Sequence, residues 1–293
     1  MGDVAASHLL EADFGDQVAL VGYDVGQDSL RAGESVDLTL FLTAQHPVTE
    51  SLMLGLQLES AGPTDDALLV NFRSWPGGGN YPTTAWQPGE AVVDRYRLQL
   101  PRDVSELQLW NLNLIFRDPQ PQPGDGGRLP VRINGATEGS HVTLARLRVE
   151  PDSDPSPPED AVYSAPFAFG AEREIVLEGA LIDGDEREVQ VALWWRVRQP
   201  LGGAYTVFVH LLDAEGQLVA AGDGPPRAGA MPTDYWRAGD VIVDRHRIPL
   251  AAPLPSGTYY VGVGFYDAVQ RLPAWDGEGQ ALQNSTAIVG EWR

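Results

Sequence analysis

The chain has 293 residues, enough for two domains of ordinary size, and its 20 basic and 41 acidic residues give it a net charge of −21. Both halves are equally acidic, so the sequence lacks the basic footprint of a nucleic-acid binder and disfavours anionic lipid surfaces. Cysteine is absent, which excludes disulfides, thiolate metal sites and cysteine nucleophiles. No segment reaches the ~20 apolar residues of a membrane-spanning helix.

Short runs in which apolar and polar residues alternate recur along most of the chain. In 36–42 the apolar residues Val36, Leu38 and Leu40 alternate with more polar ones, which predicts a strand with one buried face. The 32 glycines and 23 prolines lie largely between such runs, as expected for many tight turns. Similar strands are predicted at 189–193, 205–212 and 258–266, and no helical stripe exceeds one or two turns.

A long motif occurs twice, 150 positions apart. Residues 81–98 read YPTTAWQPGEAVVDRYRL, and residues 231–248 read MPTDYWRAGDVIVDRHRI. The similarity extends to 36–47 with 189–200, to 52–58 with 205–211, and to 112–118 with 261–267, with small offset changes in loops. We therefore expect an all-β protein of two tandem homologous antiparallel β-sandwich domains, immunoglobulin-like or jelly-roll in topology.

A proline-rich acidic stretch separates the two copies. It reads PDSDPSPPED at 151–160 and predicts an extended, semi-stiff spacer. The predicted organisation is a first sandwich at 1–150, a linker at 151–162 and a second sandwich at 163–293.

The repeated Asp-Arg-x-Arg strand invites two interpretations. Alternation places Arg95 and Arg97 on one face and Asp94 on the other, and the second copy repeats this with Arg245, Arg247 and Asp244. A pair of guanidinium groups suits a carboxylate or phosphate ligand. The alternative is a ladder of cross-strand ion pairs, with each Asp holding a turn. We favour the structural role, because residues that specify a fold survive duplication more readily than a site does.

Tryptophans supply the other candidate residues. The repeated Trp86 and Trp236 are expected to be buried, each with its indole N–H bonded to backbone. Trp75 and Trp275 lie near glycine or proline, outside the repeated motif, and are predicted to be loop residues outside the strands. With Tyr81 and Tyr235 they form the candidate platform on which a sugar ring could stack.

Catalytic and metal motifs are missing from the sequence. Acidic turns at 183–186, 213–215 and 276–278 offer oxygen ligands for Ca²⁺, yet none matches a defined loop motif, so no metal or other cofactor is predicted. The five histidines lack the spacing of a zinc site, and His210 is interpreted as a packed strand residue. No nucleophile elbow, phosphate loop or dinucleotide fingerprint occurs, so this chain is expected not to be an enzyme.

The second copy resembles soluble repeats at the C-terminal end of bacterial multi-pass membrane glycosyltransferases of the protein-mannosyltransferase-like type. The motifs are YTVFVHLLD at 205–213, DGPP at 223–226, GFYD at 264–267 and RLP at 271–273. The resemblance is weaker over 14–150, where NFRSWP at 71–76 replaces the DGPP run. It implies an extracytoplasmic region tethered to a membrane enzyme at a bacterial cell surface. The family's catalytic residues belong to its membrane part, and none corresponds to a residue here.

Three functions remain open from the sequence. The first is a non-catalytic accessory region of such a glycosyltransferase that holds a glycan or an acceptor. The second is a stand-alone carbohydrate-binding protein, and the third is a structural spacer or interaction module. If a small ligand binds, a neutral glycan is expected, since the net charge of −21 repels acidic polymers.

Overall fold

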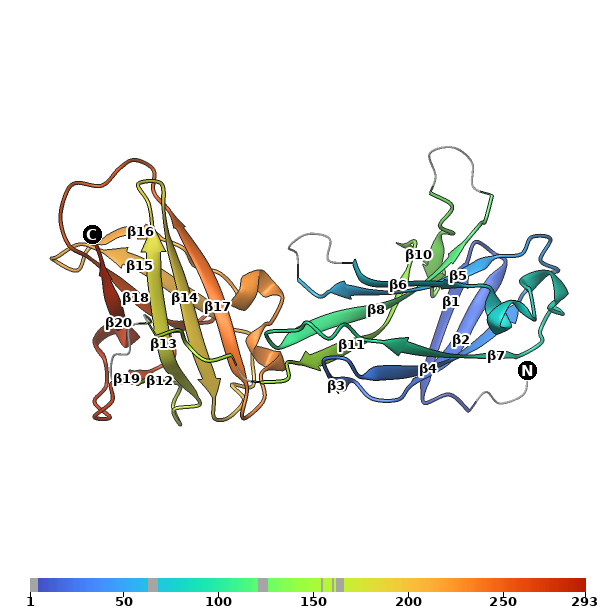
Figure 1. Ribbon diagram of the computed structural model, residues 1–293, viewed down its shortest axis with the longest axis horizontal. Helices are drawn as coiled ribbons and strands as arrows, with labels where there is room; N and C mark the ends of the chain where they lie inside the picture. The colour runs from blue at the N-terminus through green and yellow to red at the C-terminus, as the bar shows by residue number, and fades with distance from the viewer. Residues whose placement is uncertain (1–4, 63–67, 121–125, 154, 160, 162–165) are drawn as a thin grey trace. The chain divides into compact units, whose positions relative to one another are not determined.

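A computed structural model describes residues 5–62, 68–120, 126–153, 155–159, 161 and 166–293, and the described part is almost entirely β (Figure 1). Its helical segments are short 3₁₀ turns, and within these ranges no helix is long and apolar enough to cross a membrane. The chain forms two compact units. Unit 1 ends at Glu150, and unit 2 comprises Pro151–Arg293 together with Gly62 and the segment Ser105–Leu107.

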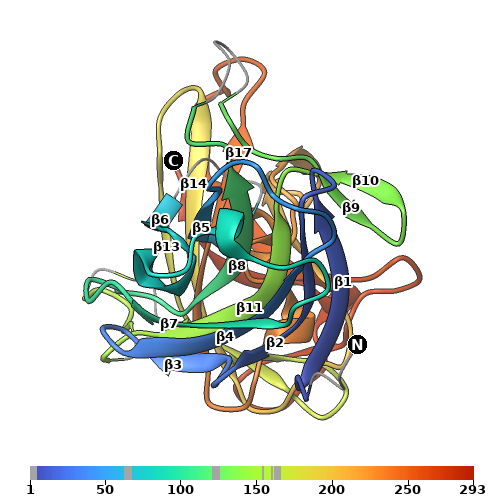
Figure 2. The ribbon, with the colours of Figure 1, turned by 90° about the vertical axis from the view of Figure 1, so that its right-hand side faces the viewer.

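Unit 1 is a sandwich of two sheets, with strand orders β10-β9-β1-β2-β4-β7 and β3-β11-β8-β5-β6. Figure 2 shows the blue strands β1, β2 and β4 curving around the green strands β8 and β11 of the opposite sheet. All neighbours are antiparallel except β3 and β11. The strands are β1 (His8–Phe14), β2 (Val18–Val25), β3 (Ser29–Arg31), β4 (Ser35–Ala44), β5 (Met53–Ser60), β6 (Leu68–Ser74), β7 (Val92–Gln99), β8 (Gln108–Arg117), β9 (Val131–Ile133), β10 (Ala136–Gly139) and β11 (Val142–Glu150).

Unit 2 has the same strand order with two strands fewer. Its sheets run β17-β14-β13-β12-β19 and β16-β15-β18-β20, so each strand has a counterpart in unit 1 once β3 and β10 are set aside. The strands are β12 (Phe167–Phe169), β13 (Ile175–Gly184), β14 (Glu188–Val197), β15 (Thr206–Leu212), β16 (Leu218–Ala221), β17 (Val241–Pro249), β18 (Tyr259–Tyr266), β19 (Ala274–Trp275) and β20 (Ala287–Trp292).

The register repeats along with the order. In unit 1 Leu40 of β4 faces Asp94 of β7, and in unit 2 Leu193 of β14 faces Asp244 of β17. The first three long strands share one sheet, and the next two, β5 and β6, form a hairpin in the other before β7 returns beside β4. From β2 onward the order is immunoglobulin-like: β2, β4 and β7 take the places of strands A, B and E, and β5, β8 and β11 those of C, F and G, with β1 added beside β2.

Alternating apolar residues build each core. Along β4 the residues from Val36 to Leu42 alternate between buried and less buried, as the pattern predicts, and the buried ones pack against leucines of β5 and β8. In unit 2 an aromatic cluster fills the space between the sheets, where Phe265 contacts Phe169, Trp195 and Trp236. Large aromatics bury much apolar area each, so these clusters stabilise both sandwiches.

The stretch predicted as a linker differs from a free spacer where it is described. Ala161 is buried, and a Cβ on Gly179 of β13 would lie 2.8 Å from the Cβ of Pro157. The proline ring thus packs on a strand of unit 2 at a position where only glycine leaves room for it. Residues 154, 160 and 162 of the expected linker lie outside the described part of the chain.

Candidate binding site

The repeated tryptophans close the core of each sandwich. Trp86 and Trp236 are 2% and 1% exposed, as expected. The Nε1–H of Trp86 donates to the carbonyl of Tyr81 at 3.1 Å, and that of Trp236 to the carbonyl of Met231 at 2.9 Å. Each indole buries its ring and satisfies its polar atom, so neither ring is available to a ligand.

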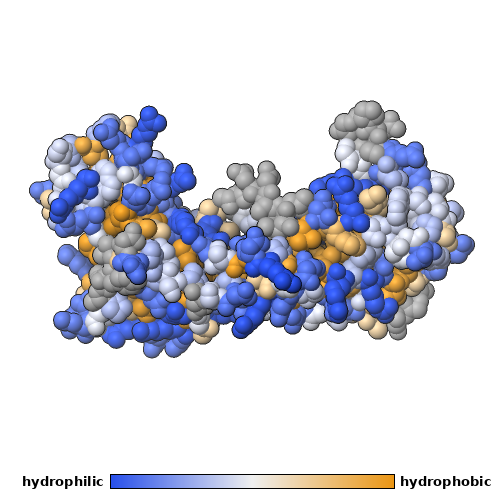
Figure 3. All heavy atoms as spheres, in the orientation of Figure 1, coloured by the Kyte–Doolittle hydropathy of each residue, from blue (hydrophilic) through white to orange (hydrophobic). Residues whose placement is uncertain are grey.

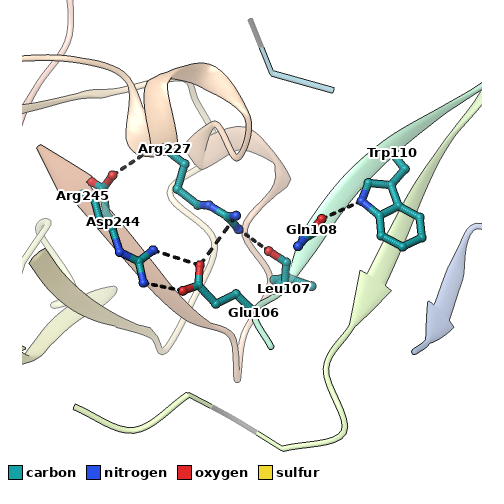
Figure 4. Close-up of polar contacts among 7 residues, drawn as sticks. All are labelled: Glu106, Leu107, Gln108, Trp110, Arg227, Asp244 and Arg245. Atoms are coloured by element: carbon teal, nitrogen blue, oxygen red, sulfur yellow. Dashed lines mark hydrogen bonds and ion pairs between the residues drawn. The ribbon is translucent and has the colours of Figure 1, made fainter. Parts of the chain in front are cut away.

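The repeated aspartates hold a loop of unusual conformation. Asp94 accepts the backbone N–H of Gly77 at 2.9 Å, and Asp244 accepts that of Arg227 at 2.7 Å (Figure 4). Gly77 and Gly78 have positive φ, and in unit 2 Arg227 and Ala228 adopt the same left-handed conformation at φ 52° and 53°. Non-glycine residues are strained there, so the buried carboxylate stabilises a backbone that its sequence disfavours.

A second contact ties the same loop of unit 2 to the segment Ser105–Leu107. The guanidinium of Arg245 donates to Glu106 at 2.6 and 3.2 Å, Arg227 lies 3.6 Å from the same carboxylate, and Arg227 also donates to the carbonyl of Leu107 (Figure 4). The pKa of Arg227 is lowered by burial, which Glu106 partly offsets. Arg245 is therefore occupied by a carboxylate of the chain.

The exposed arginines of the motif face outward, as alternation predicts. Arg97 makes a bidentate pair with Asp37 across the β4–β7 ladder, with nitrogen–oxygen distances of 2.6 and 2.8 Å. Arg247 lies 3.9 Å from Glu188 on the neighbouring strand. These contacts favour the ion-pair interpretation over a ligand clamp for Arg97 and Arg247, while Arg95 is exposed beside Asp94.

His246 occupies the position that Tyr96 has in unit 1, and unlike tyrosine it can titrate near neutral pH. Its Nε2 lies 2.8 Å from Asp244 and its Nδ1 lies 2.9 Å from the carbonyl of Gly222, so both ring nitrogens face acceptors. Burial opposes charge on the ring, yet the hydrogen bond to Asp244 and the charges of Asp244 and Asp223 outweigh it and raise the pKa of His246. The geometry suits an imidazolium that donates twice.

The raised pKa predicts a pH dependence with a defined sign. The contribution of His246 to stability should be complete below its unfolded pKa of ~6.5 and should be lost as pH rises through the folded pKa. His246→Tyr installs the unit 1 residue and should flatten the curve above pH ~6.5. Urea unfolding from pH 6 to 9 checks this, and a variant with the slope of the unchanged chain would contradict it.

The four aromatic residues proposed for stacking belong to different units, Trp75 and Tyr81 to unit 1 and Tyr235 and Trp275 to unit 2. Trp75 is 37% exposed and follows β6, whereas the hydroxyl of Tyr81 is engaged by Glu90 at 2.9 Å. Tyr235 is 38% exposed in a 3₁₀ turn. The prediction that Trp275 lies outside the strands is wrong: it pairs with Ala168 as part of β19.

Trp275 is held on two sides. Its Nε1–H donates to the carbonyl of Gly170 at 3.0 Å, and the guanidinium carbon of Arg173 lies 5.2 Å from the ring centroid. Two residues, Ala274 and Trp275, were enough to extend the sheet beside β12, a pairing too short to leave a periodic signal in the sequence. Because these contacts engage its ring and its N–H group, Trp275 is a weaker stacking surface than the sequence predicted.

The acidic turns are occupied by their own backbone. Asp185 accepts the N–H groups of Arg187 and Glu188, and Asp213 and Asp276 each accept two N–H groups of the residues that follow. These are side-chain-stabilised turns. In the described residues no three His, Asp or Glu side chains form a group that could hold a metal ion.

The outer face of the sheet β16-β15-β18-β20 carries a candidate site in unit 2. Two adjoining pockets, of about 410 and 500 Å³, share His210 and Arg271. Phe208 and His210 project from β15 away from the core, opposite Gly264 and Gly262 of β18. A Cβ on Gly264 would lie 2.5 Å from the Phe208 ring, so glycine lets that ring lie flat on the sheet.

Arg271 is held firmly in the middle of this face. Its guanidinium carbon lies 4.2 Å from the centroid of the Phe208 ring, and its Nη1 donates to the carbonyl of Asn284 at 3.0 Å and to Thr286 at 3.2 Å. These contacts fix the planar fork of Arg271, which lines both pockets. Preorganisation of this kind lowers the entropic cost of binding.

His210 was interpreted as a packed residue, but it lines both pockets. Its Nε2 lies 3.3 Å from Asp223, whose Oδ1 also accepts the N–H of Val209 at 3.1 Å. Burial lowers the pKa of His210, and the attraction of Asp223 only partly offsets this. The ring is therefore largely neutral at pH 7, with Asp223 and Arg271 supplying opposite charges beside it.

The rim of the site combines apolar and amide groups. Leu218, Val269 and Ile288 are exposed large hydrophobics that border the pockets, on a chain whose visible surface is largely hydrophilic (Figure 3). Gln270, Gln283 and Asn284 add amides. The DGPP and RLP motifs, which supply Asp223 and Arg271, marked these positions in the sequence, but only the fold brings them to His210.

No family model matches the chain, and no curated protein sequence does. A crystal structure of a DUF4785 family protein from Legionella pneumophila is similar over 93% of this chain and 57% of that one, with 10% identity and a TM-score of 0.23. The chain thus spans little more than half the length of that protein.

Proposed function

We propose that the chain is a non-catalytic binding region that holds a neutral glycan on the outer face of the sheet β16-β15-β18-β20. The observation that carries the proposal is the pair of pockets around His210 and Arg271. A preorganised guanidinium, a carboxylate and side-chain amides can each pair with sugar hydroxyls, while apolar rims cover the sugar's carbon faces.

The charge balance favours a neutral ligand here. Arg271 is the cation of the site, and Asp223 and Asp267 lie on the same pocket wall. An anionic ligand would gain from Arg271 but would meet both carboxylates at short range. Hydroxyl groups, in contrast, donate to Asp223 and accept from Arg271 without leaving a charge unpaired.

The setting of this region is part of the proposal. The resemblance of 167–290 to repeats of membrane glycosyltransferases suggests an extracytoplasmic module that holds a glycan or acceptor for a tethered enzyme. We expect no turnover of glycosides or lipid-phosphate sugars by this chain, because its motifs lack a nucleophile and a general-base pair with catalytic spacing. Turnover that a point substitution abolishes would overturn this expectation.

Arg271→Ala is expected to weaken neutral glycan binding by about 10- to 100-fold, since hydrogen bonds to a charged group contribute about 1.5–3 kcal/mol. Isothermal titration with a panel of neutral oligosaccharides measures the change. Arg95→Ala in unit 1 removes an equal, exposed charge and is the matched control, which should bind normally.

Two results would count against the site. If binding survives Arg271→Ala but is lost in Trp275→Ala, the glycan binds at the aromatic residues and not at Arg271. Absence of binding at millimolar glycan by the unchanged chain would favour the structural spacer.

A further inference from the structure

Unit 1 carries three arginines on the outer face of the sheet β3-β11-β8-β5-β6, the face that corresponds to the candidate site of unit 2. Arg73 of β6 lies opposite Gly55 of β5, and Arg117 of β8 lies opposite Met53 on the other side of that strand. Arg128 forms an isolated bridge with Arg117. Residues directly opposite one another point to the same face, so the three side chains gather on one surface.

None of these arginines is paired with a carboxylate among the described residues. Arg128 donates to the side-chain oxygen of Gln57 at 3.1 Å, and Arg117 donates to the carbonyl of Gly126 at 2.8 Å. The Nε of Arg117 is buried without a hydrogen-bond partner in the described structure. Arg73 is exposed, and its side chain makes no hydrogen bond or ion pair with the residues that the structure describes.

The three arginines carry like charges that act on one another. The pKa of Arg117 is lowered by burial first and then by the charges of Arg128 and Arg73. The three positive charges therefore repel one another, and a bound anion would relieve that repulsion.

The corresponding positions of unit 2 show that the fold does not require this charge. There Asp223 takes the place of Arg73 and lies opposite Phe208, just as Arg73 lies opposite Gly55. Tyr266 takes the place of Arg117 and forms the corresponding bridge with Arg271. The second unit folds with a balanced set of charges at the same site. Unit 2 keeps Arg128 as Arg271, so the comparison shows that this fold requires neither Arg73 nor Arg117 at these positions.

We propose that Arg73, Arg117 and Arg128 bind the phosphate or carboxylate group of an acidic sugar. Guanidinium groups match both oxyanions with paired hydrogen bonds. The side chain of Ile115 lies over Gly55 on this face, since a Cβ on Gly55 would lie 2.5 Å from it. Trp75 follows Ser74 in extended backbone (φ −78°, ψ 141°) and is 37% exposed, so its ring continues the row of Arg73 and offers a surface for the sugar.

Isothermal titration of the full chain tests the proposal with glucose 1-phosphate, glucuronate, inorganic phosphate and neutral glucose. Glucose 1-phosphate or glucuronate should bind, glucose should not bind at this site, and added salt should weaken binding. Arg73→Gln, which touches no other described side chain, should weaken the anionic sugar by about tenfold. Arg95→Gln removes an equal charge elsewhere on unit 1 and should change nothing.

The choice of probes distinguishes a phosphate ligand from a carboxylate ligand. A preference for glucose 1-phosphate assigns a phosphate ligand, and a preference for glucuronate assigns a carboxylate ligand. Equal losses in Arg73→Gln and Arg95→Gln would overturn the site, as would no uptake of any anionic probe at roughly 10 mM. Arg271→Ala should leave anionic binding intact, so this test and that of the neutral glycan site succeed or fail independently.

Discussion

Replacing Asp244 with alanine is expected to destabilise unit 2 by about 3–5 kcal/mol, because the change strips a buried carboxylate from its partners. Asp244 is fully buried and accepts from the backbone N–H of Arg227, from His246 at 2.8 Å and from Trp195 at 3.4 Å. Without it, the His246 ring loses its counter-charge and the strained Arg227–Ala228 backbone loses its anchor. Urea unfolding at pH 7 measures the loss.

Two companion variants separate the contributions. Asp244→Asn keeps an acceptor for Arg227 but removes the charge, so it should cost less, about 1–3 kcal/mol. Asp94→Ala removes the counterpart in unit 1, where the neutral Tyr96 replaces the histidine and the held residues are glycines, and it should cost about 2 kcal/mol. A loss under ~1 kcal/mol in Asp244→Ala would show that the carboxylate does not anchor the loop.

Trp236→Ala should destabilise unit 2 by about 3–5 kcal/mol through the cavity that it leaves. The indole is 1% exposed, its ring meets Phe265 edge to face at 6.1 Å between centroids, and its N–H satisfies the carbonyl of Met231. The substitution removes both the packing and the hydrogen bond. Urea unfolding with near-ultraviolet circular dichroism reports both stability and aromatic packing.

Trp236→Phe distinguishes the two losses. It retains much of the buried ring but leaves the Met231 carbonyl without its donor, so its cost should lie well below that of alanine, at about 1–3 kcal/mol. Trp86→Ala in unit 1 should behave like Trp236→Ala, since it has the same burial and the same backbone partner five residues earlier. If phenylalanine proved as damaging as alanine, the hydrogen bond rather than the packing would dominate.

These predictions separate the framework from the sites. Trp86, Trp236, Asp94 and Asp244 recur at equivalent places, and in both units they support the core and the adjacent loop. The two outer faces have diverged: His210, Asp223 and Tyr266 stand where unit 1 has Gln57, Arg73 and Arg117. Arg128 and Arg271 are repeated and belong to both proposed sites, and the residues around them that differ between the copies set the proposed ligand of each face.

Much of the architecture was determined by the sequence alone. Period-2 alternation predicted the strands and their faces, because one side of each strand must be buried. The 150-residue repeat predicted equivalent roles for Trp86 and Trp236, and the indole of an internal tryptophan needs a backbone acceptor. The outward direction of Arg95 and Arg97 followed from the same alternation, which needs no knowledge of neighbouring strands.

Only the tertiary structure decided the topology and the sites. Alternation says which face of a strand is buried but not which strand lies beside it, so the immunoglobulin-like strand order and the edge pairing of Trp275 were invisible in the sequence. His210, Asp223 and Arg271 are far apart along the chain, and so are Arg73, Arg117 and Arg128. Strand pairing alone brings each set together, because contacts across a sheet depend on register rather than on sequence separation.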